Sequence, residues 1–247
     1  AEEGASAGDI IVTARRQNER LVDVPASVSV LTSETLERTG VQSAEGLTRL
    51  TPGITIVTGT AEAGDTQINI RGINGARDAE SSVALVVDGI LKTNSAQLNQ
   101  DQGTLRQIEV LKGPQGAIYG RNAAAGAIVL TTVKPGDTLE GEVRASAANE
   151  QTYDVSAFIA TPVGEGAGLV LSAAYRTTNG FFRNLFLNDK VVDDQRTWSI
   201  DGRFVAQLGD ATELDIKARY ADLSGVSINF NAAFHLPNFA AANPAFN

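Results

Sequence analysis

Residues 105–132 read LRQIEVLKGPQGAIYGRNAAAGAIVLTT, two apolar runs separated by a glycine-rich joint. The runs 105–111 and 126–132 have the apolar, β-branched composition of strands. Glycines within 113–116 and 120–126 allow positive φ angles and close backbone approach, so the chain can turn tightly between the two strands. The joint lacks the spacing of a Walker or dinucleotide-binding loop, which argues against a nucleotide site.

The chain before residue 135 mixes helix signals with strand signals. Thr32 can cap a short helix that runs through Leu36 and ends at Gly40, and Ser43 can cap a second that stops before Pro52. Further strands are predicted at residues 26–31, 54–57, 67–71 and 83–87. Together these elements predict a small α+β domain.

From Glu140 onward the apolar residues recur at every second position. The clearest case is 214–220, where four apolar residues alternate with Asp215, Lys217 and Arg219. Similar alternation occurs in 143–147, 152–159, 169–175 and 198–204. Strands of about 9–11 residues with one apolar and one polar face are typical of an outer-membrane β-barrel. A soluble β-sandwich has the same alternation and is the alternative fold.

The lengths of the connections favour the barrel. Links 162–168 and 209–211 are short, whereas 177–194 is long and aromatic. Outer-membrane barrels have short periplasmic turns and longer extracellular loops. This pattern predicts that 162–168 and 209–211 are periplasmic and that 177–194 is extracellular, with 149–151 as an unusually short outer hairpin.

Composition excludes several functional classes. The 247 residues include 29 acidic and 20 basic side chains, a net charge of −9 that repels nucleic acid. No cysteine is present, so a disulfide, a thiolate zinc site and a thiol nucleophile are excluded. No segment approaches the roughly 20 apolar residues of a transmembrane helix. The first residues, Ala1, Glu2, Glu3 and Gly4, are consistent with a mature end left by signal-peptide removal.

Three motifs resemble those of TonB-dependent outer-membrane receptors, in the order expected for that family. Residues 108–123 (IEVLKGPQGAIYGRNA) resemble the motif near the end of the receptor plug, and 67–72 (QINIRG) and 83–89 (VALVVDG) resemble two earlier plug motifs. The resemblance implies an α+β plug domain at 21–135, followed at 136–247 by the first strands, roughly five, of a large transmembrane β-barrel that is incomplete in this chain. It also implies a bacterial outer-membrane location, with the plug in the barrel lumen facing the periplasm.

A short β-branched run near the amino end looks like the TonB box of this family. The resemblance places it in a flexible segment, 1–20, and implies that it binds the C-terminal domain of TonB. A β-branched run can add as an extra strand to a partner's sheet edge, although an ordinary edge strand looks identical. With so few residues before it, the separate signalling domain of some relatives is not expected. The predicted box consists of Asp9, Ile10, Ile11, Val12, Thr13 and Ala14.

Two plug cations match positions where relatives carry arginines that pair with carboxylates of the barrel wall. These residues are Arg71 and Lys112. The resemblance implies that they latch the plug in the lumen; solvation in a water-filled lumen is the alternative. Lys112 offers a point charge rather than a planar fork, so a bidentate pair is lost there. The answering glutamates are expected in later strands.

Substrate contacts are expected at the plug apices and the extracellular loops. Two polar segments flanked by glycine, 74–80 and 92–100, are the candidate apices. Arg77, Asn94 and Gln97 are the predicted contacts, and plain solvated loop is the alternative.

Nothing in the sequence predicts an enzyme, a cofactor or a metal site. The single histidine, His235, has no nearby nucleophile and no metal-ligand spacing. Asp189, Asp193 and Asp194 could offer oxygen ligands to calcium but lack the pattern of a calcium loop, so a solvated acidic loop is expected.

Five strands cannot close a lumen, because plugged transporters use about 22. Open strand edges cannot face lipid, so the remaining strands are expected from the rest of a longer receptor or from a companion chain.

The predicted function is TonB-dependent import of a scarce nutrient such as a siderophore-bound iron, cobalamin or a glycan. The alternatives are a surface binding module or adhesin that does not transport, and a transducer that senses without import. The substrate itself does not follow from the fold.

Overall fold

Residues 105–132 form two neighbouring strands, β9 (Leu105–Lys112) and β10 (Gly126–Thr132), joined through the short helix α3 (Gly116–Tyr119). The strands pair antiparallel, with Gly126 opposite Lys112. They occupy the middle of a five-stranded sheet of order β3-β9-β10-β7-β8, called the plug sheet below. In this sheet β7 and β10 run parallel and the other pairs are antiparallel.

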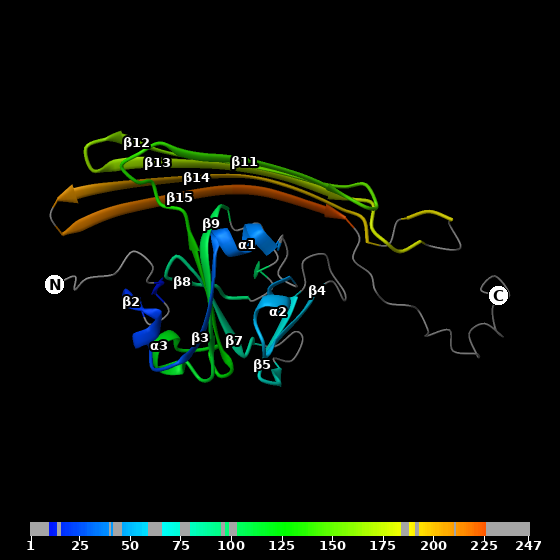
Figure 1. Cartoon of the computed structure of the whole chain (residues 1–247), viewed down its shortest axis with the longest axis horizontal. Helices are drawn as coiled ribbons and strands as arrows, with labels where there is room; N and C mark the ends of the chain where they lie inside the picture. The colour runs from blue at the N-terminus through cyan, green and yellow to red at the C-terminus, as the bar shows by residue number, and fades with distance from the viewer. Residues whose placement is uncertain are drawn as a thin grey trace.

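The computed structural model describes residues 10–13, 16–39, 41, 46–58, 66–74, 80–94, 97–98, 103–183, 188–190, 193–209 and 211–225. Before β9 the elements are β1 (Ile11–Val12), β2 (Glu19–Arg20), η1 (Leu21–Asp23), β3 (Ser27–Thr32), α1 (Ser33–Thr39), α2 (Gly46–Leu50), β4 (Ile54–Thr58), β5 (Thr66–Ile70), β6 (Ile73–Asn74), β7 (Val83–Val87) and β8 (Ile90–Leu91). After β10 come β11 (Glu140–Ala148), β12 (Thr152–Gly164), β13 (Ala167–Thr178), β14 (Gln195–Gly209) and β15 (Thr212–Gly225). These last five strands pair in chain order as one antiparallel sheet, called the wall below. Figure 1 shows the wall as a curved layer with the earlier elements packed on one side of it.

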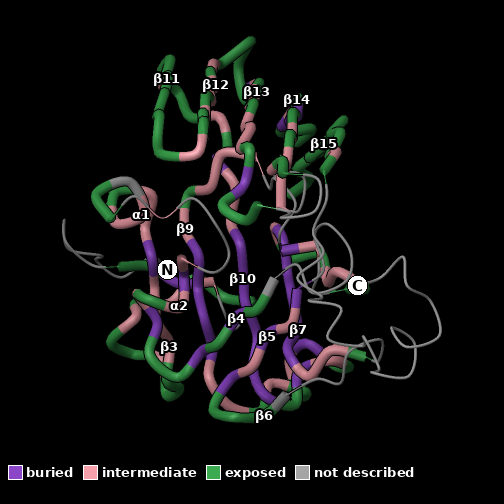
Figure 2. The backbone as a smooth tube through the Cα atoms, turned by 90° about the vertical axis from the view of Figure 1, so that its right-hand side faces the viewer, coloured by how far each residue is buried: buried purple, intermediate pink, exposed green. Residues whose placement is uncertain are grey.

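Both faces of the plug sheet are covered, which explains why β7 reads as an unbroken apolar run. All five β7 residues are buried. Val83, Leu85 and Val87 face one cluster, which includes residues of α2, β4 and β5, while Ala84 and Val86 face a second cluster that includes Tyr119. Figure 2 shows the buried backbone concentrated in the plug sheet.

The wall has its apolar side facing outward. Ile200 and Ile216 are 55% and 52% exposed on the outer face, whereas Arg203, on the face that packs on the plug, is 6% exposed. In the described residues the wall is a single layer and does not fold onto a second sheet of its own. The α+β domain followed by antiparallel strands is therefore confirmed, and the two-layer sandwich is excluded for these strands.

Some boundaries differ from those expected. The short link predicted at 162–168 is present but narrower, because β12 continues to Gly164 and β13 begins at Ala167, leaving a tight turn in which Gly166 has a φ of 67°. The sequence pattern also did not predict α3 or the two-residue strands. Among the described residues, no helix has both the length and the apolar composition needed to cross a membrane.

Candidate functional site

The N-terminal strand β1 lies against the plug rather than free of it. Ile11 and Val12 pair with Arg20 and Glu19 of β2, and Leu21 N donates a hydrogen bond of 2.8 Å to Ile10 O. Val12 is 1% exposed. Residues 10–13 of the predicted TonB box are thus docked in this structure, in contrast to the flexible segment expected, while Asp9 and Ala14 lie outside the described residues.

A buried carboxylate, Glu109 of β9, holds the end of this strand. Ile108 and Val110 point into one core cluster, so the alternation of β9 directs Glu109 to the opposite face, where β1 lies. Its two oxygens accept hydrogen bonds from Thr13 N at 2.8 and 3.0 Å, and Oε1 accepts one from Thr13 Oγ1 at 2.9 Å. Gln107 Nε2 donates to Glu109 Oε1 at 2.5 Å and to Ile11 O at 3.1 Å. We call this set of contacts the N-terminal dock.

The dock uses neutral donors to compensate a buried charge. Glu109 is 0% exposed, and no basic side chain in the described part of the chain forms an ion pair with it. Removing a buried carboxylate from water is costly unless hydrogen bonds replace the lost hydration. Thr13 supplies most of those bonds, so the N-terminal strand and Glu109 stabilise each other.

Tyr119 lies beside the dock, with Arg16 Cζ 5.6 Å from its ring centroid. Burial, and to a smaller extent the negative charge of Glu109, raise the pKa of the Tyr119 phenol to about 12, although Arg16 acts in the opposite direction. The folded chain therefore holds this proton more tightly than the unfolded chain. The resulting stabilisation is complete below the ordinary pKa of 10.0 and is lost as the pH rises toward about 12.

We expect an ultraviolet pH titration of the wild type, minus that of Tyr119→Phe, to show a phenol that ionises near pH 12. Glu109→Gln should lower this pKa, because it removes the neighbouring negative charge. Ionisation at the ordinary tyrosine value in the folded protein would contradict the buried position of the ring.

A second polar cluster joins the plug to the wall, centred on Asp88. Asp88 and Gly89 form the turn between β7 and β8, with φ angles of 48° and 83°, a conformation that Asp and Gly tolerate. The Asp88 carboxylate accepts hydrogen bonds of 2.8 Å from both Thr132 N and Thr132 Oγ1, at the end of β10. Lys217 of the wall strand β15 donates to the same carboxylate.

Arg203 of β14 completes this cluster. It forms a two-point pair with Asp215, Nε to Oδ1 at 3.0 Å and Nη2 to Oδ2 at 2.6 Å. Its Nη1 donates to Thr132 Oγ1 at 2.8 Å, to Thr132 O at 3.2 Å and to Val133 O at 3.0 Å. It also lies 3.8 Å from Asp88 Oδ1. We call Asp88, Thr132, Arg203, Asp215 and Lys217 the junction cluster.

The junction cluster borders a cavity of about 270 Å³ between plug and wall, whose lining also includes Asp201 and Arg219. Burial acts to raise the pKa of Asp88, but hydrogen bonds from Lys217 and Thr132 outweigh it, so the pKa lies below its ordinary value. Asp88 is therefore ionised at neutral pH and attracts the two wall cations.

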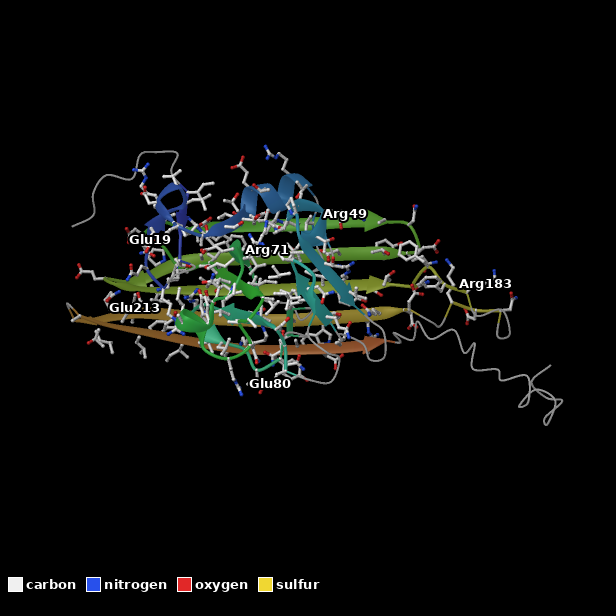
Figure 3. The ribbon with its side chains drawn as sticks, turned by 90° about the horizontal axis from the view of Figure 1, so that it is seen from below. Glu19, Arg49, Arg71, Glu80, Arg183 and Glu213 are labelled. Carbon is white, nitrogen blue, oxygen red and sulfur yellow. The ribbon has the colours of Figure 1, made fainter. Side chains whose placement is uncertain are left out.

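The predicted latch residues occupy a different place. Arg71, labelled in Figure 3, is exposed in the turn between β5 and β6, and Lys112 ends β9. Burial and the nearby charge of Arg71 lower the pKa of Lys112. Within the described ranges neither cation has an acidic partner, so their pairing with later wall strands stays a prediction.

Of the predicted substrate contacts, Arg77 lies outside the described residues. Asn94 is exposed and Gln97 half-buried, and Gln97 N donates to Asn94 O at 3.2 Å, which places both in one turn. The role of these residues in substrate binding stays a prediction. The single histidine, His235, also lies outside the described residues.

The acidic loop 189–194 has a structural feature of its own. Asp193 accepts hydrogen bonds from Phe181 N at 2.9 Å and Phe182 N at 3.1 Å, so it joins the residues that follow β13 to those that precede β14. No group of three potential metal-ligating side chains is found in the part of the chain that the structure describes.

Glu109, Asp88 and Arg203 were not predicted as site residues. Glu109 and Asp88 stand inside the quoted motifs, where a charge within an apolar run (Glu109) or directly after one (Asp88) was the available signal. Arg203 is one of several charged residues on the polar face of the wall, and the sequence does not distinguish it from the others.

Residues 20–127 match the family model described as the TonB-dependent Receptor Plug Domain. Two curated relatives resemble a longer part of the chain. The pesticin receptor of Yersinia pestis is 30% identical over 161 residues, which are 64% of this chain and 23% of that protein. The vitamin B12 transporter BtuB of Vibrio vulnificus is 30% identical over 187 residues, 73% of this chain and 30% of that protein. The chain thus spans less than a third of the length of these relatives.

Solved structures show the same fold. The ferric yersiniabactin uptake receptor FyuA of Yersinia pestis superimposes with a TM-score of 0.72 at 23% identity, covering 80% of this chain and 32% of that one. The alcaligin outer-membrane receptor FauA of Bordetella pertussis gives a TM-score of 0.66 at 20% identity, covering 86% of this chain and 35% of that one. Both comparisons include wall strands as well as the plug, since they extend beyond the length of the family match.

Proposed function

The chain carries the plug domain of the TonB-dependent receptors followed by antiparallel strands of the receptor fold, and from this premise we propose that it serves nutrient import across the outer membrane. The matched family consists of receptors and transporters rather than enzymes. In this proposal the outer face of the wall contacts lipid, and the remaining wall strands complete a barrel around the plug. TonB supplies the force for import through residues 9–14.

The observation that carries the proposal is the N-terminal strand. It is a two-residue strand that, among the described residues, pairs only with the equally short β2, and it belongs to neither the plug sheet nor the wall. Its contacts with the plug are the short pairing with β2, the hydrogen bonds to Glu109 and Gln107, and the buried side chain of Val12. None of these is part of the ladder of either large sheet, so the segment can leave without disrupting them. Once released, its β-branched residues can add to the edge of a partner's sheet.

The outward apolar face of the wall supports the location. In water, isoleucines that are more than half exposed on a regular strand would be an unfavourable surface. In lipid the same alternation is favourable, and charges on that face are destabilising. The polar face of the wall instead packs on the plug, where its charges find partners.

Deleting residues 9–14 from the complete receptor should stop import and leave substrate binding intact. The probes are radioiron-labelled ferric siderophores of the hydroxamate, catecholate and phenolate classes, together with radiocobalt-labelled vitamin B12. Ile11→Pro should have the same effect, because proline cannot donate the backbone hydrogen bond that strand addition needs. Ile11→Val is the matched control and should import normally.

Uptake that persists after the deletion, for a probe that the wild type imports, would refute the proposed role of these residues. A wild-type receptor that binds a probe but takes up none of the probes would instead indicate a surface binding module.

A further inference from the structure

We infer that Asp88 anchors one side of the plug to the wall, and that this side stays attached while the N-terminal side moves. The inference rests on the proposed import function and concerns how the plug opens. It is carried by the junction cluster, which lies apart from the N-terminal dock and apart from the predicted latch.

The junction cluster connects three segments that are far apart in the sequence. Asp88 binds the end of its own sheet through Thr132, and it binds the wall through Lys217, which follows 129 residues later. Arg203 contacts the backbone carbonyls of Thr132 and Val133 from the wall side. The wall strand β14 is thereby joined to the end of β10 and to the turn after β7, and β15 is joined to that turn.

Burial makes this junction hard to break. The side chains of Asp88 and Arg203 are each 7% exposed. Separating plug from wall here would break the contacts of Lys217 with Asp88 and of Arg203 with Thr132 and Val133. These charge-assisted hydrogen bonds are shielded from water and are therefore stronger than a surface ion pair. Lys134 and Glu213 form another ion pair between the segment after β10 and the wall, but their side chains are 50% and 39% exposed. Water can therefore replace this contact at little cost.

The anchor and the N-terminal dock lie on different strands. The dock is on β9, whereas the junction cluster is on β10 and the β7–β8 turn. The chain also passes from plug to wall directly after Thr132, so the covalent link reinforces the anchored side. A pull on the N-terminal strand therefore acts on the β3–β9 side of the sheet first, while β10 and β7 are held.

The test is a covalent replacement of the anchor in the complete receptor. Asp88→Cys combined with Lys217→Cys removes the ionic contact, and a short bis-maleimide then bridges the two thiols. This chain has no other cysteine to react. In planar lipid bilayers the unbridged pair should conduct potassium chloride roughly tenfold more often than the wild type, because charge-assisted hydrogen bonds no longer hold the plug. Bridging should restore both the closed state and the uptake of whichever labelled probe the wild type imports.

Two results would overturn the inference. If bridging blocks uptake that the unbridged pair supports, this side of the plug must open during import. If the unbridged pair conducts no more than the wild type, Asp88 is not an anchor.

Asp88→Asn is the conservative variant should the cysteine pair fold poorly, and it should raise conductance in the same way. Lys134→Gln, at the exposed pair, should not raise conductance. If the wild type takes up no probe, the import proposal fails, and the conductance measurements still decide whether Asp88 is an anchor.

Discussion

Replacing Glu109 by glutamine should release the N-terminal strand while leaving the rest of the plug folded. Glutamine has the same shape, but its amide nitrogen can only donate and would face the donor groups of Thr13. If the lost hydrogen bonds to the carboxylate cost about 2 kcal/mol, the released fraction rises roughly thirtyfold. A spin label on Ile10→Cys, in a chain with no other cysteine, would report this as a large gain in mobility.

Thr13 provides graded controls for this experiment. Thr13→Ser keeps both the backbone N–H and the hydroxyl that bind Glu109, so the label should stay immobile. Thr13→Val loses only the hydroxyl and should fall between the wild type and Glu109→Gln. An immobile label in Glu109→Gln would show that strand pairing with β2, and not the carboxylate, holds the segment.

Arg203→Met should produce the largest loss of stability. Methionine fills a similar volume but leaves Asp215 without its two-point partner and removes one of the two wall cations beside Asp88. Removing one partner from a buried ion pair costs about 3–5 kcal/mol. Urea unfolding of the complete receptor in detergent micelles, followed by its shift in migration on unheated gels, would measure the loss.

Arg196 is a matched control on the same strand, because it is exposed near the first residue of β14. Arg196→Met should change the free energy of unfolding by less than about 1 kcal/mol. Equal losses from the two substitutions would mean that the contacts of Arg203 with Thr132 and Asp215 contribute no more than a surface charge does.

Most of the fold could be predicted from local patterns. The strand predicted at 83–87 coincides with β7, and the predicted strand 126–132 coincides with β10. These segments consist almost entirely of apolar, largely β-branched residues, and they are buried by neighbouring strands of similar composition. The alternation after Glu140 likewise predicts the wall, because one face must be apolar whatever the details of packing.

The sites could not be predicted in the same way, because each depends on residues distant in sequence. Thr13 meets Glu109 across 96 positions, and Arg203 meets Thr132 across 71. A β-branched run near the amino end predicts a strand but does not identify its acceptor. The motif resemblance directed attention to Arg71 and Lys112, whose expected partners lie in strands beyond those described, rather than to the acidic residues within the same motifs.

The parallel pairing of β7 with β10 has a consequence for how the chain reaches its final form. Val83–Val87 is entirely apolar and β-branched or aliphatic, and its partner β10 begins only at Gly126. Until β10 has been made and has closed that long loop, one edge of this apolar strand has no partner, and such segments aggregate readily. Asp88 follows it directly, and Ser81 and Ser82 precede it, where polar residues discourage intermolecular stacking. The carboxylate at the end of β7 would therefore protect the newly exported polypeptide before it ever touches the wall.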